Sequence, residues 1–154
     1  MEQIKYLLIT HYHPDHMGIA GELMKLGIKL LLLDVQKDYV QYSDSIFDKE
    51  KNGSYIPVHA DQATVITCCE SRAFLKELGI GGEIVHTPGH SDDSISLVLD
   101  DGSAIVGDLY TWESTLGYDN PQVMDSWKLL ISKGVKLAFY GHANEQLIEG
   151  GGNG

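Results

Sequence analysis

A run of side chains of the kind that bind metals stands directly after a short apolar segment of this chain. Residues 4–10 are almost continuously apolar and predict a buried strand. The next six residues contain His11, His13, Asp15 and His16. His11 and His13 point the same way in an extended chain, and the other two lie beyond a proline and can turn towards a second point. Imidazole nitrogens and carboxylate oxygens are ligands that zinc and similar metals prefer, so the run predicts a metal site.

Three further residues of the same chemical kind follow predicted strands. His90 and His142 each come after a glycine, and Asp108 ends another strand. The ends of neighbouring strands lie close together where they leave a sheet, and functional sites of α/β proteins are often built there. A lone histidine after a glycine is usually a turn or surface residue, so neither histidine by itself would indicate a ligand. The combined set of five histidines and two aspartates suits two metals that share one bridging ligand.

Alternating strand and helix patterns predict the α/β class, with a sheet flanked by helices. Strands are expected at 4–10, 29–33, 64–67, 83–86, 95–99, 104–106 and 136–140, with a hairpin turn at 100–102. Helices are expected at 15–26, 35–49, 69–78 and 123–132, and a turn or loop at 51–54. Residues 1–148 are predicted to form one domain, followed by a flexible glycine-rich tail at 149–154.

Composition excludes several classes of protein. A chain of 154 residues can bury the core of one domain. Its net charge of −11, without a cluster of Lys or Arg, argues against a nucleic-acid partner. No apolar run approaches the roughly 20 residues of a membrane span, and the start of the sequence lacks signal-peptide features, so a cytoplasmic location is expected. Cys68 and Cys69 are adjacent, which excludes a disulfide framework, and a catalytic thiol is not expected without a base.

The sequence resembles the metallo-β-lactamase superfamily in four motifs that occur in the same order and at similar spacings. These motifs are Thr10-His11-Tyr12-His13-Pro14-Asp15-His16, Thr87-Pro88-Gly89-His90-Ser91, Gly107-Asp108 and Tyr140-Gly141-His142. The resemblance covers residues 4–145 and implies an αββα sandwich. It implies one metal held by His11, His13 and His90. It implies a second metal held by Asp15, His16 and His142, with Asp108 bridging the two.

The same resemblance indicates a branch of the family. The His-x-His-x-Asp-His pattern is similar to the hydrolytic, glyoxalase II-like branch, because the oxygen-reducing diiron branch usually has Glu at the position of His13. We therefore expect a hydrolase in which a hydroxide bridging two divalent metals attacks an ester, thioester, lactone, amide or phosphoester of a small molecule. Asp15 is expected to orient this nucleophile as well as to bind metal. Zinc is the first expectation, with iron or manganese as alternatives.

Two other functions stay open at this point. The chain could be a metal-binding or interaction module without turnover, or it could have a redox role with iron. Members of the family carry several strands before the first motif, including one that ends in an Asp-Thr-Gly-type turn, whereas here the motif begins at Thr10. The αββα sandwich would then lack its usual N-terminal strands. Because an uncovered sheet face exposes apolar surface that promotes association, we expect a homo-oligomer or a partner that covers the sheet.

Several residues outside the motifs allow two interpretations. His86 is expected to be a packed residue and His59 a loop residue. Asp92 and Asp93 either orient a ligand histidine or only shape their loop. Three aromatic residues follow the predicted bridging aspartate, and they either line a substrate pocket or cover an exposed part of the hydrophobic core: Tyr110, Trp112 and Tyr118.

Overall fold

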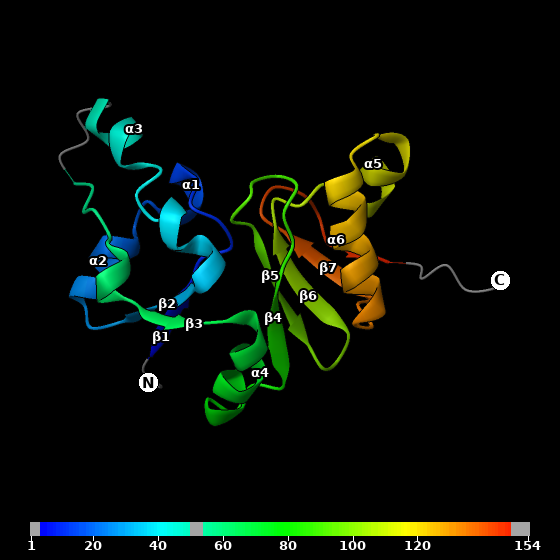
Figure 1. Cartoon of the computed structure of the whole chain (residues 1–154), viewed down its shortest axis with the longest axis horizontal. Helices are drawn as coiled ribbons and strands as arrows, with labels where there is room; N and C mark the ends of the chain where they lie inside the picture. Colours follow the sequence, from blue (N-terminus) through cyan, green and yellow to red (C-terminus); the bar gives the residue numbers. More distant parts are fainter. Residues whose placement is uncertain (1–3, 50–53, 149–154) are drawn as a thin grey trace. The chain divides into compact units, whose positions relative to one another are not determined.

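The computed structural model describes residues 4–49 and 54–148, which divide into two compact units, residues 1–67 and 68–154. Each unit has its own sheet and its own hydrophobic core (Figure 1). The mixed α/β class expected from the alternating patterns is confirmed. Most of the predicted turn at 51–54, and the whole predicted tail at 149–154, lie outside the described residues.

The first unit is built on a three-stranded parallel sheet in the order β1-β2-β3. The three strands fall where the sequence predicts them, at β1 Tyr6–Leu8, β2 Lys29–Leu33 and β3 Thr64–Ile66. Four consecutive leucines of β2 are buried, which is the pattern of a parallel strand covered on both faces. The core beside this sheet consists of Ile9, Tyr12, Met17, Ala20, Leu30, Leu32, Val40 and Val58.

The helices of the first unit are shorter than the sequence predicts. The helix expected over 15–26 is two helices, α1 Pro14–Met17 and α2 Ala20–Lys25. Gly18, a poor helix former, lies at the break between them. The helix expected over 35–49 is also wrong in extent, because the chain forms the 3₁₀ helix η1 Asp34–Tyr39 and then α3 Asp44–Lys49. A further 3₁₀ turn, η2 Ala60–Gln62, precedes β3.

The second unit is built on a five-stranded mixed sheet in the order β4-β5-β6-β7-β8. Its strands are β4 Gly82–His86, β5 Ile95–Leu99, β6 Ser103–Gly107, β7 Leu137–Tyr140 and β8 Gln146–Leu147. The predicted antiparallel hairpin of β5 and β6 is confirmed. Because β5 is antiparallel to both neighbours and β6 is parallel to β7, the strands β4, β6 and β7 all end at the same edge of the sheet.

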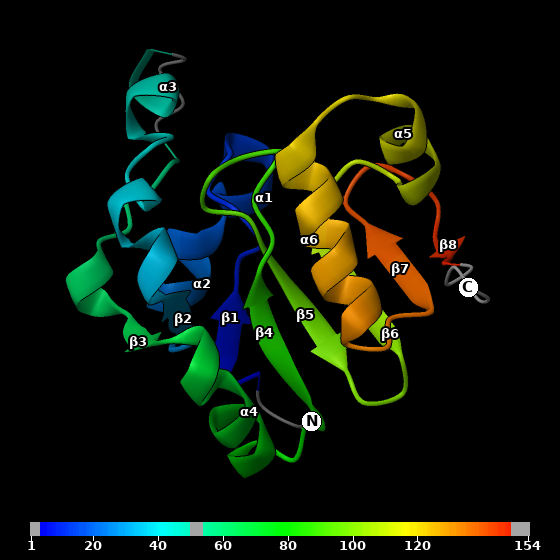
Figure 2. The same cartoon turned by 45° about the vertical axis from the view of Figure 1, so that its right-hand side comes forward.

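Helix α6, Pro121–Ser132, lies across one face of this sheet (Figure 2). Asn120 caps it, accepting the N–H groups of Gln122 and Val123, and a proline occupies its first turn. Trp127 and Leu130 of this helix are fully buried against the sheet. The opposite face of the sheet exposes three apolar side chains from neighbouring strands: Ile105, Phe139 and Leu147.

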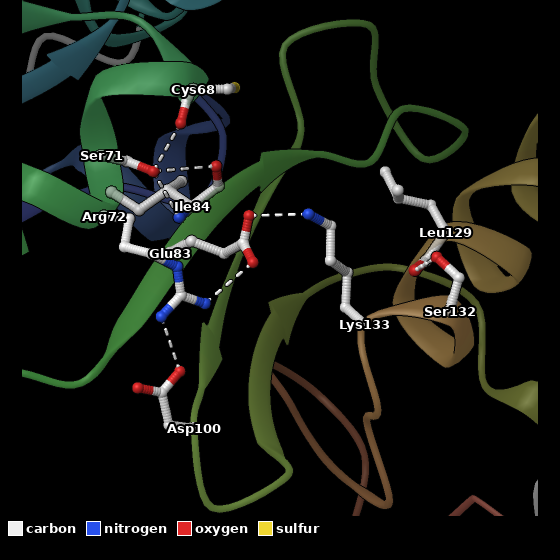
Figure 3. A network of polar contacts seen from close by, with 9 residues as sticks. All are labelled: Cys68, Ser71, Arg72, Glu83, Ile84, Asp100, Leu129, Ser132 and Lys133. Atoms are coloured by element: carbon white, nitrogen blue, oxygen red, sulfur yellow. Dashed lines mark hydrogen bonds and ion pairs between the residues drawn. The ribbon is translucent and has the colours of Figure 1, made fainter.

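Helix α4, Cys68–Glu77, is tied to the same sheet by an ion-pair network around Glu83 (Figure 3). Arg72 of α4 donates to Glu83 Oε1 at 2.9 Å and to Asp100 Oδ1 at 2.8 Å. Lys133, just after α6, donates to Glu83 Oε2 at 2.8 Å. The hydrogen bond from Lys133, followed by that from Arg72, lowers the pKa of the Glu83 carboxyl. One carboxylate therefore joins a strand to two helices.

None of the helices within residues 4–49 and 54–148 combines the length and the apolar character that crossing a membrane requires.

Candidate metal centre

The first unit gathers four of the predicted ligands in the loop after β1 and in helix α1. His11 is buried, and its Nε2 lies 3.1 Å from Nδ1 of His13. The ring centroids of His11 and His16 are 4.1 Å apart. Nε2 of His16 lies 3.4 Å from Oδ2 of Asp15, whose side chain is 54% exposed. This run therefore forms one compact group of nitrogen and oxygen donors.

Two buried polar side chains hold the backbone of this loop. The Gln36 amide donates to the carbonyl of Ile9 at 3.0 Å, and the Ser43 hydroxyl donates to the carbonyl of Tyr12 at 2.6 Å. Tyr12 itself is buried in the core of the unit, which fixes the loop between two ligand histidines. The roles of Gln36 and Ser43 were not predicted from the sequence. Both lie in the stretch interpreted as one helix, and no local pattern in a single sequence marks a contact to a loop far along the chain.

The second unit gathers the other three predicted ligands at the edge where β4, β6 and β7 end. Nε2 of His90 and Nε2 of His142 each lie 3.6 Å from Oδ2 of Asp108. One carboxylate oxygen is thus placed close to two imidazole nitrogens. The His142 side chain is 64% exposed, whereas those of His90 and Asp108 are 24% and 14% exposed.

Helix α6 holds the two loops that carry His90 and Asp108. The Ser126 hydroxyl donates to the carbonyl of Pro88 at 2.7 Å, and the Trp127 indole N–H donates to the carbonyl of Tyr110 at 2.8 Å. Gly89 has φ +139°, and a Cβ there would lie 2.5 Å from Val123 Cγ2. The Thr-Pro-Gly-His motif therefore needs glycine both for its backbone conformation and for its close approach to the helix.

The donor chemistry in each unit fits a divalent cation. The first group offers three imidazoles and a carboxylate, and the second offers two imidazoles and a carboxylate. These are the donor types that zinc, iron and manganese accept. The structure thus places four predicted ligands together in the first unit and three in the second.

A pocket of about 240 Å³ adjoins the second group of donors. Tyr110, Thr111, Ser114 and Tyr140 contribute to its wall, beside His90, Asp108 and His142. Burial raises the pKa of Tyr140 to about 12, although the N–H of Trp112, which its oxygen accepts, acts in the opposite direction. The Tyr140 hydroxyl also donates to Oε1 of Gln146 at 3.1 Å. Tyr140 is therefore a neutral wall residue at neutral pH.

The three aromatic residues after Asp108 divide between the two interpretations offered by the sequence. Tyr110 lines the pocket, and its ring lies 5.7 Å from that of the exposed Tyr118. Trp112 instead packs on the core, with its ring 5.9 Å from that of Trp127. Helix α5, Trp112–Gly117, which the sequence analysis did not predict, carries this segment and is capped by Thr111. Two aromatic residues close together in the sequence thus have different roles, since Tyr110 forms part of the pocket wall and Trp112 packs on the hydrophobic core.

The remaining histidines lie outside the donor groups. His86 ends β4 and is half-buried, with its Nε2 2.7 Å from the carbonyl oxygen of Asp92. His59 is exposed in a loop, with its Nδ1 3.0 Å from Nε2 of Gln41. The contact between Asp92 and His86 shapes the loop that leads to the next strand, and the carboxylate of Asp93 is buried. The expectations for His59 as a loop residue and His86 as a packed residue agree with these positions.

A family model described as the metallo-beta-lactamase superfamily matches residues 2–142. The chain belongs to the metallo-β-lactamase superfamily. This match includes all four motifs that the sequence analysis used, and the mixed α/β fold of the chain agrees with it. The seven donors described above occupy the motif positions of this metallo-β-lactamase-type sequence.

Curated relatives of the metallo-β-lactamase superfamily match most of this chain at low identity. An atrochrysone carboxyl ACP thioesterase of Aspergillus terreus is 25% identical over 145 residues, which cover 90% of this chain and 37% of the thioesterase. A beta-lactamase-like protein 2 homolog of Drosophila melanogaster is 27% identical over 142 residues, covering 92% of this chain and 45% of that protein. The chain therefore spans less than half the length of these two relatives.

Solved structures of the superfamily share the fold of this chain. A protein crystallised in a di-iron-bound form, TTHA1623, has a TM-score of 0.68 and 23% identity, and the match covers 96% of this chain and 73% of that protein. The B3 metallo-β-lactamase BLEG-1 has a TM-score of 0.67 and 20% identity, with 93% and 71% covered. The predicted metallo-β-lactamase-like fold is thereby confirmed.

Proposed function

We propose that this chain is a metal-dependent hydrolase that cleaves an ester, thioester, lactone, amide or phosphoester. The observation that carries the proposal is the placement of Asp108 Oδ2 at 3.6 Å from Nε2 of both His90 and His142, in a chain of the metallo-β-lactamase superfamily. A single carboxylate oxygen between two imidazoles suits a bridging ligand. The name of the thioesterase relative supports hydrolysis of an acyl bond.

The proposed ligands come from both groups of donors. His11, His13 and His90 would hold one divalent ion, and Asp15, His16 and His142 a second, with Asp108 shared. Bound divalent ions would lower the pKa of water from 15.7 to about 7 and polarise the scissile group. Zinc is the proposed metal, iron and manganese being alternatives with the same donor chemistry. A cytoplasmic location also stays a prediction.

The residues of the chain would contribute binding, orientation and proton transfer. Asp15 has an exposed carboxylate 3.4 Å from His16 Nε2, so it can orient an attacking water and accept its proton at Oδ2. The buried His11 is fixed by its loop and would keep the first group of donors in place. No serine or cysteine nucleophile is required for this chemistry.

The test measures metal content and turnover on the same preparation. The full chain, purified without added metal, is analysed for its elements and then assayed before and after loading with zinc, iron or manganese. The substrates are a thioester, an ester, a lactone, a β-lactam and a phosphoester. We expect about two metals per chain and turnover of at least one substrate. His13→Ala should lose roughly 10²-fold or more in kcat/KM, whereas His59→Ala should keep the activity.

Equal activity of His13→Ala and the parent chain would contradict the proposal, as would a complete absence of turnover in every metal-loaded form. The second outcome, combined with two bound metals per chain, would instead favour a metal-binding module without turnover. A visible absorption band in freshly purified protein would indicate iron and a redox role.

A further inference from the structure

An exposed aromatic ring lies beside the first group of donors. The ring centroid of Tyr42 lies 5.6 Å from that of His13, at an interplanar angle of 39°, and Tyr42 stays 57% exposed. We infer that Tyr42 binds the substrate, with its ring packing against an aromatic group next to the bond that is cleaved. This inference rests on the proposed hydrolytic function and adds to it a residue that sets substrate preference.

The first argument is that Tyr42 differs from the other aromatic residues described in its unit. Those residues are buried or half-buried, and most of them pack in or against the core: Tyr6, Tyr12, Tyr39, Phe47 and Tyr55. An aromatic ring left in water forgoes the stabilisation that burial of its apolar surface gives. A ligand that covered the ring of Tyr42 would recover this stabilisation, and the ring is already placed next to a predicted metal ligand.

The second argument is the rigidity of the turn that carries Tyr42 between η1 and α3. The N–H of Tyr42 donates to the carbonyl of Tyr39 at 2.8 Å. The next residue, Ser43, is fully buried and donates to the carbonyl of Tyr12 at 2.6 Å, in the loop that carries His13. The backbone of Tyr42 is therefore held on both sides and tied to the donor loop. A side chain on a backbone held in this way loses less conformational freedom when a ligand packs on it.

The third argument is the part of the Tyr42 ring that His13 leaves free. The two rings are tilted towards each other, and more than half of the surface of Tyr42 remains exposed after this contact. Aromatic pairs prefer offset or edge-on contacts and gain free energy beyond the burial of their area. The exposed part of the ring can therefore accept a second aromatic group while the first contact is kept. An alkyl group of the substrate would gain only the burial of its area.

The first experiment compares aryl and alkyl substrates with the metal-loaded full chain. S-Phenyl thioacetate and S-ethyl thiobenzoate are each set against S-ethyl thioacetate, and the corresponding oxygen esters are treated in the same way, so that the aromatic ring lies on either side of the scissile bond. The measured quantity is the aryl-to-alkyl ratio of kcat/KM. Comparing this ratio between variants cancels the intrinsic reactivities of the substrates. Tyr42→Ala should lower the ratio about 2- to 10-fold for at least one pair, through KM, whereas Tyr42→Phe should keep it.

Two controls separate substrate binding from a purely structural role of Tyr42. Leu26→Ala removes another exposed apolar side chain of the same unit, 79% exposed, and should leave the ratio unchanged. Leu26 precedes β2, which is parallel to the strand that the donors follow, so it lies towards the opposite edge of the sheet. Competition with a chelating dye should give the same metal affinity for Tyr42→Ala and the parent chain. Weaker metal binding with equal losses for aryl and alkyl substrates would show that the ring only covers His13, and it would overturn the inference.

The second experiment measures binding without turnover. Benzamide and acetamide are titrated into the zinc-loaded chain and followed by NMR. Benzamide should show nuclear Overhauser contacts to the ring protons of Tyr42, and Tyr42→Ala should weaken its binding about 2- to 10-fold while leaving acetamide unchanged. Circular dichroism and thermal melts establish that each variant is folded.

The two experiments distinguish the failure of this inference from the failure of the proposed function. Benzamide binding that depends on Tyr42, without turnover of any substrate, would support the binding role of Tyr42 and contradict the hydrolase. Turnover with the same aryl-to-alkyl ratio in Tyr42→Ala and the parent chain would keep the hydrolase and overturn the inference. A loss in Tyr42→Phe as large as that in Tyr42→Ala would also overturn it, because the hydroxyl and not the ring would then be the contact. Absence of both turnover and benzamide binding would contradict both proposals.

Discussion

Gln36 offers the sharpest test of how the loop of the first donor group is held in place. Its side chain is fully buried, and its amide donates to the carbonyls of Ile9 at 3.0 Å and Thr10 at 3.4 Å. Its Oε1 accepts the N–H of Leu33 at 3.4 Å. Gln36→Met keeps nearly the same volume and removes these hydrogen bonds. The change therefore separates the loss of hydrogen bonding from the creation of a cavity.

The expected destabilisation follows from the backbone groups left behind. A buried polar group that loses its partner costs about 1–3 kcal/mol. The contact to Ile9 has a good length and should contribute towards the middle of that range. The longer contact to Leu33 should contribute near its lower end, and the long, part-buried contact to Thr10 should add little. The sum is about 2–4 kcal/mol. With a urea m-value of about 2 kcal/mol/M, the unfolding midpoint should fall by roughly 1–2 M.

Urea denaturation of the metal-free chain, followed by circular dichroism, measures this shift. Gln41→Met is the matched control, because the Gln41 side chain is exposed and its contact to His59 is exposed too, so the change should alter stability by about 0.5 kcal/mol or less. Competition with a chelating dye should also show metal affinity weakened about 10–100-fold in Gln36→Met, since the loop beside His11 loses its anchor. If Gln36→Met and Gln41→Met had equal midpoints, the reasoning would be refuted.

Four other outcomes can be measured. The pKa of Glu83 is lowered in the folded chain, so its ion pairs stabilise the fold above the unfolded value near 4.5, and this stabilisation is lost as the pH falls through the folded pKa. Glu83→Gln should therefore lower the free energy of unfolding by about 1 kcal/mol at pH 7 and by progressively less as the pH falls below 4.5, and a pH-independent cost would contradict this. Gly89→Ala should cost about 2 kcal/mol or more in thermal unfolding, whereas Gly117→Ala, where a Cβ meets nothing within 4 Å, should be neutral or slightly stabilising. Removing metal with a chelator should lower the melting temperature. Adding metal at about 100 times its Kd should restore about 2.7 kcal/mol of unfolding free energy, and an unchanged melting temperature would argue against bound metal. Self-association stays a prediction, in which a second copy of the chain covers Ile105, Phe139 and Leu147. Analytical ultracentrifugation should then show a dimer, and Phe139→Ser should weaken it. A monomer at all concentrations would contradict this prediction.

The strands and the ligand motifs were predictable because their signals are local. The buried run in β2 and the Asp-Asp-Gly turn between β5 and β6 each mark one element within a few residues. The predicted ligands stand directly after strands, so the direction of β4, β6 and β7 places His90, Asp108 and His142 at one edge of the second sheet. Here periodicity and motif order were sufficient.

The helices between the strands were predicted less well because long-range contacts decide them. The apolar spacing over 15–26 fits one helix, yet the helix is interrupted at Gly18. Gly21 lies so close to Ile56 that a Cβ at Gly21 would clash with the carbonyl oxygen of Ile56. Helix α5 has no amphipathic period of its own and depends on its Thr111 cap and on Trp112 packing against Trp127. Contacts of this kind leave no local pattern in a single sequence.

The way each donor group is held has a consequence for the proposed function. Gln36 and Ser43 hold the first group from within the first unit, and Ser126 and Trp127 hold the second group from within the second unit. Each half of the ligand set is therefore organised by local contacts before any metal binds.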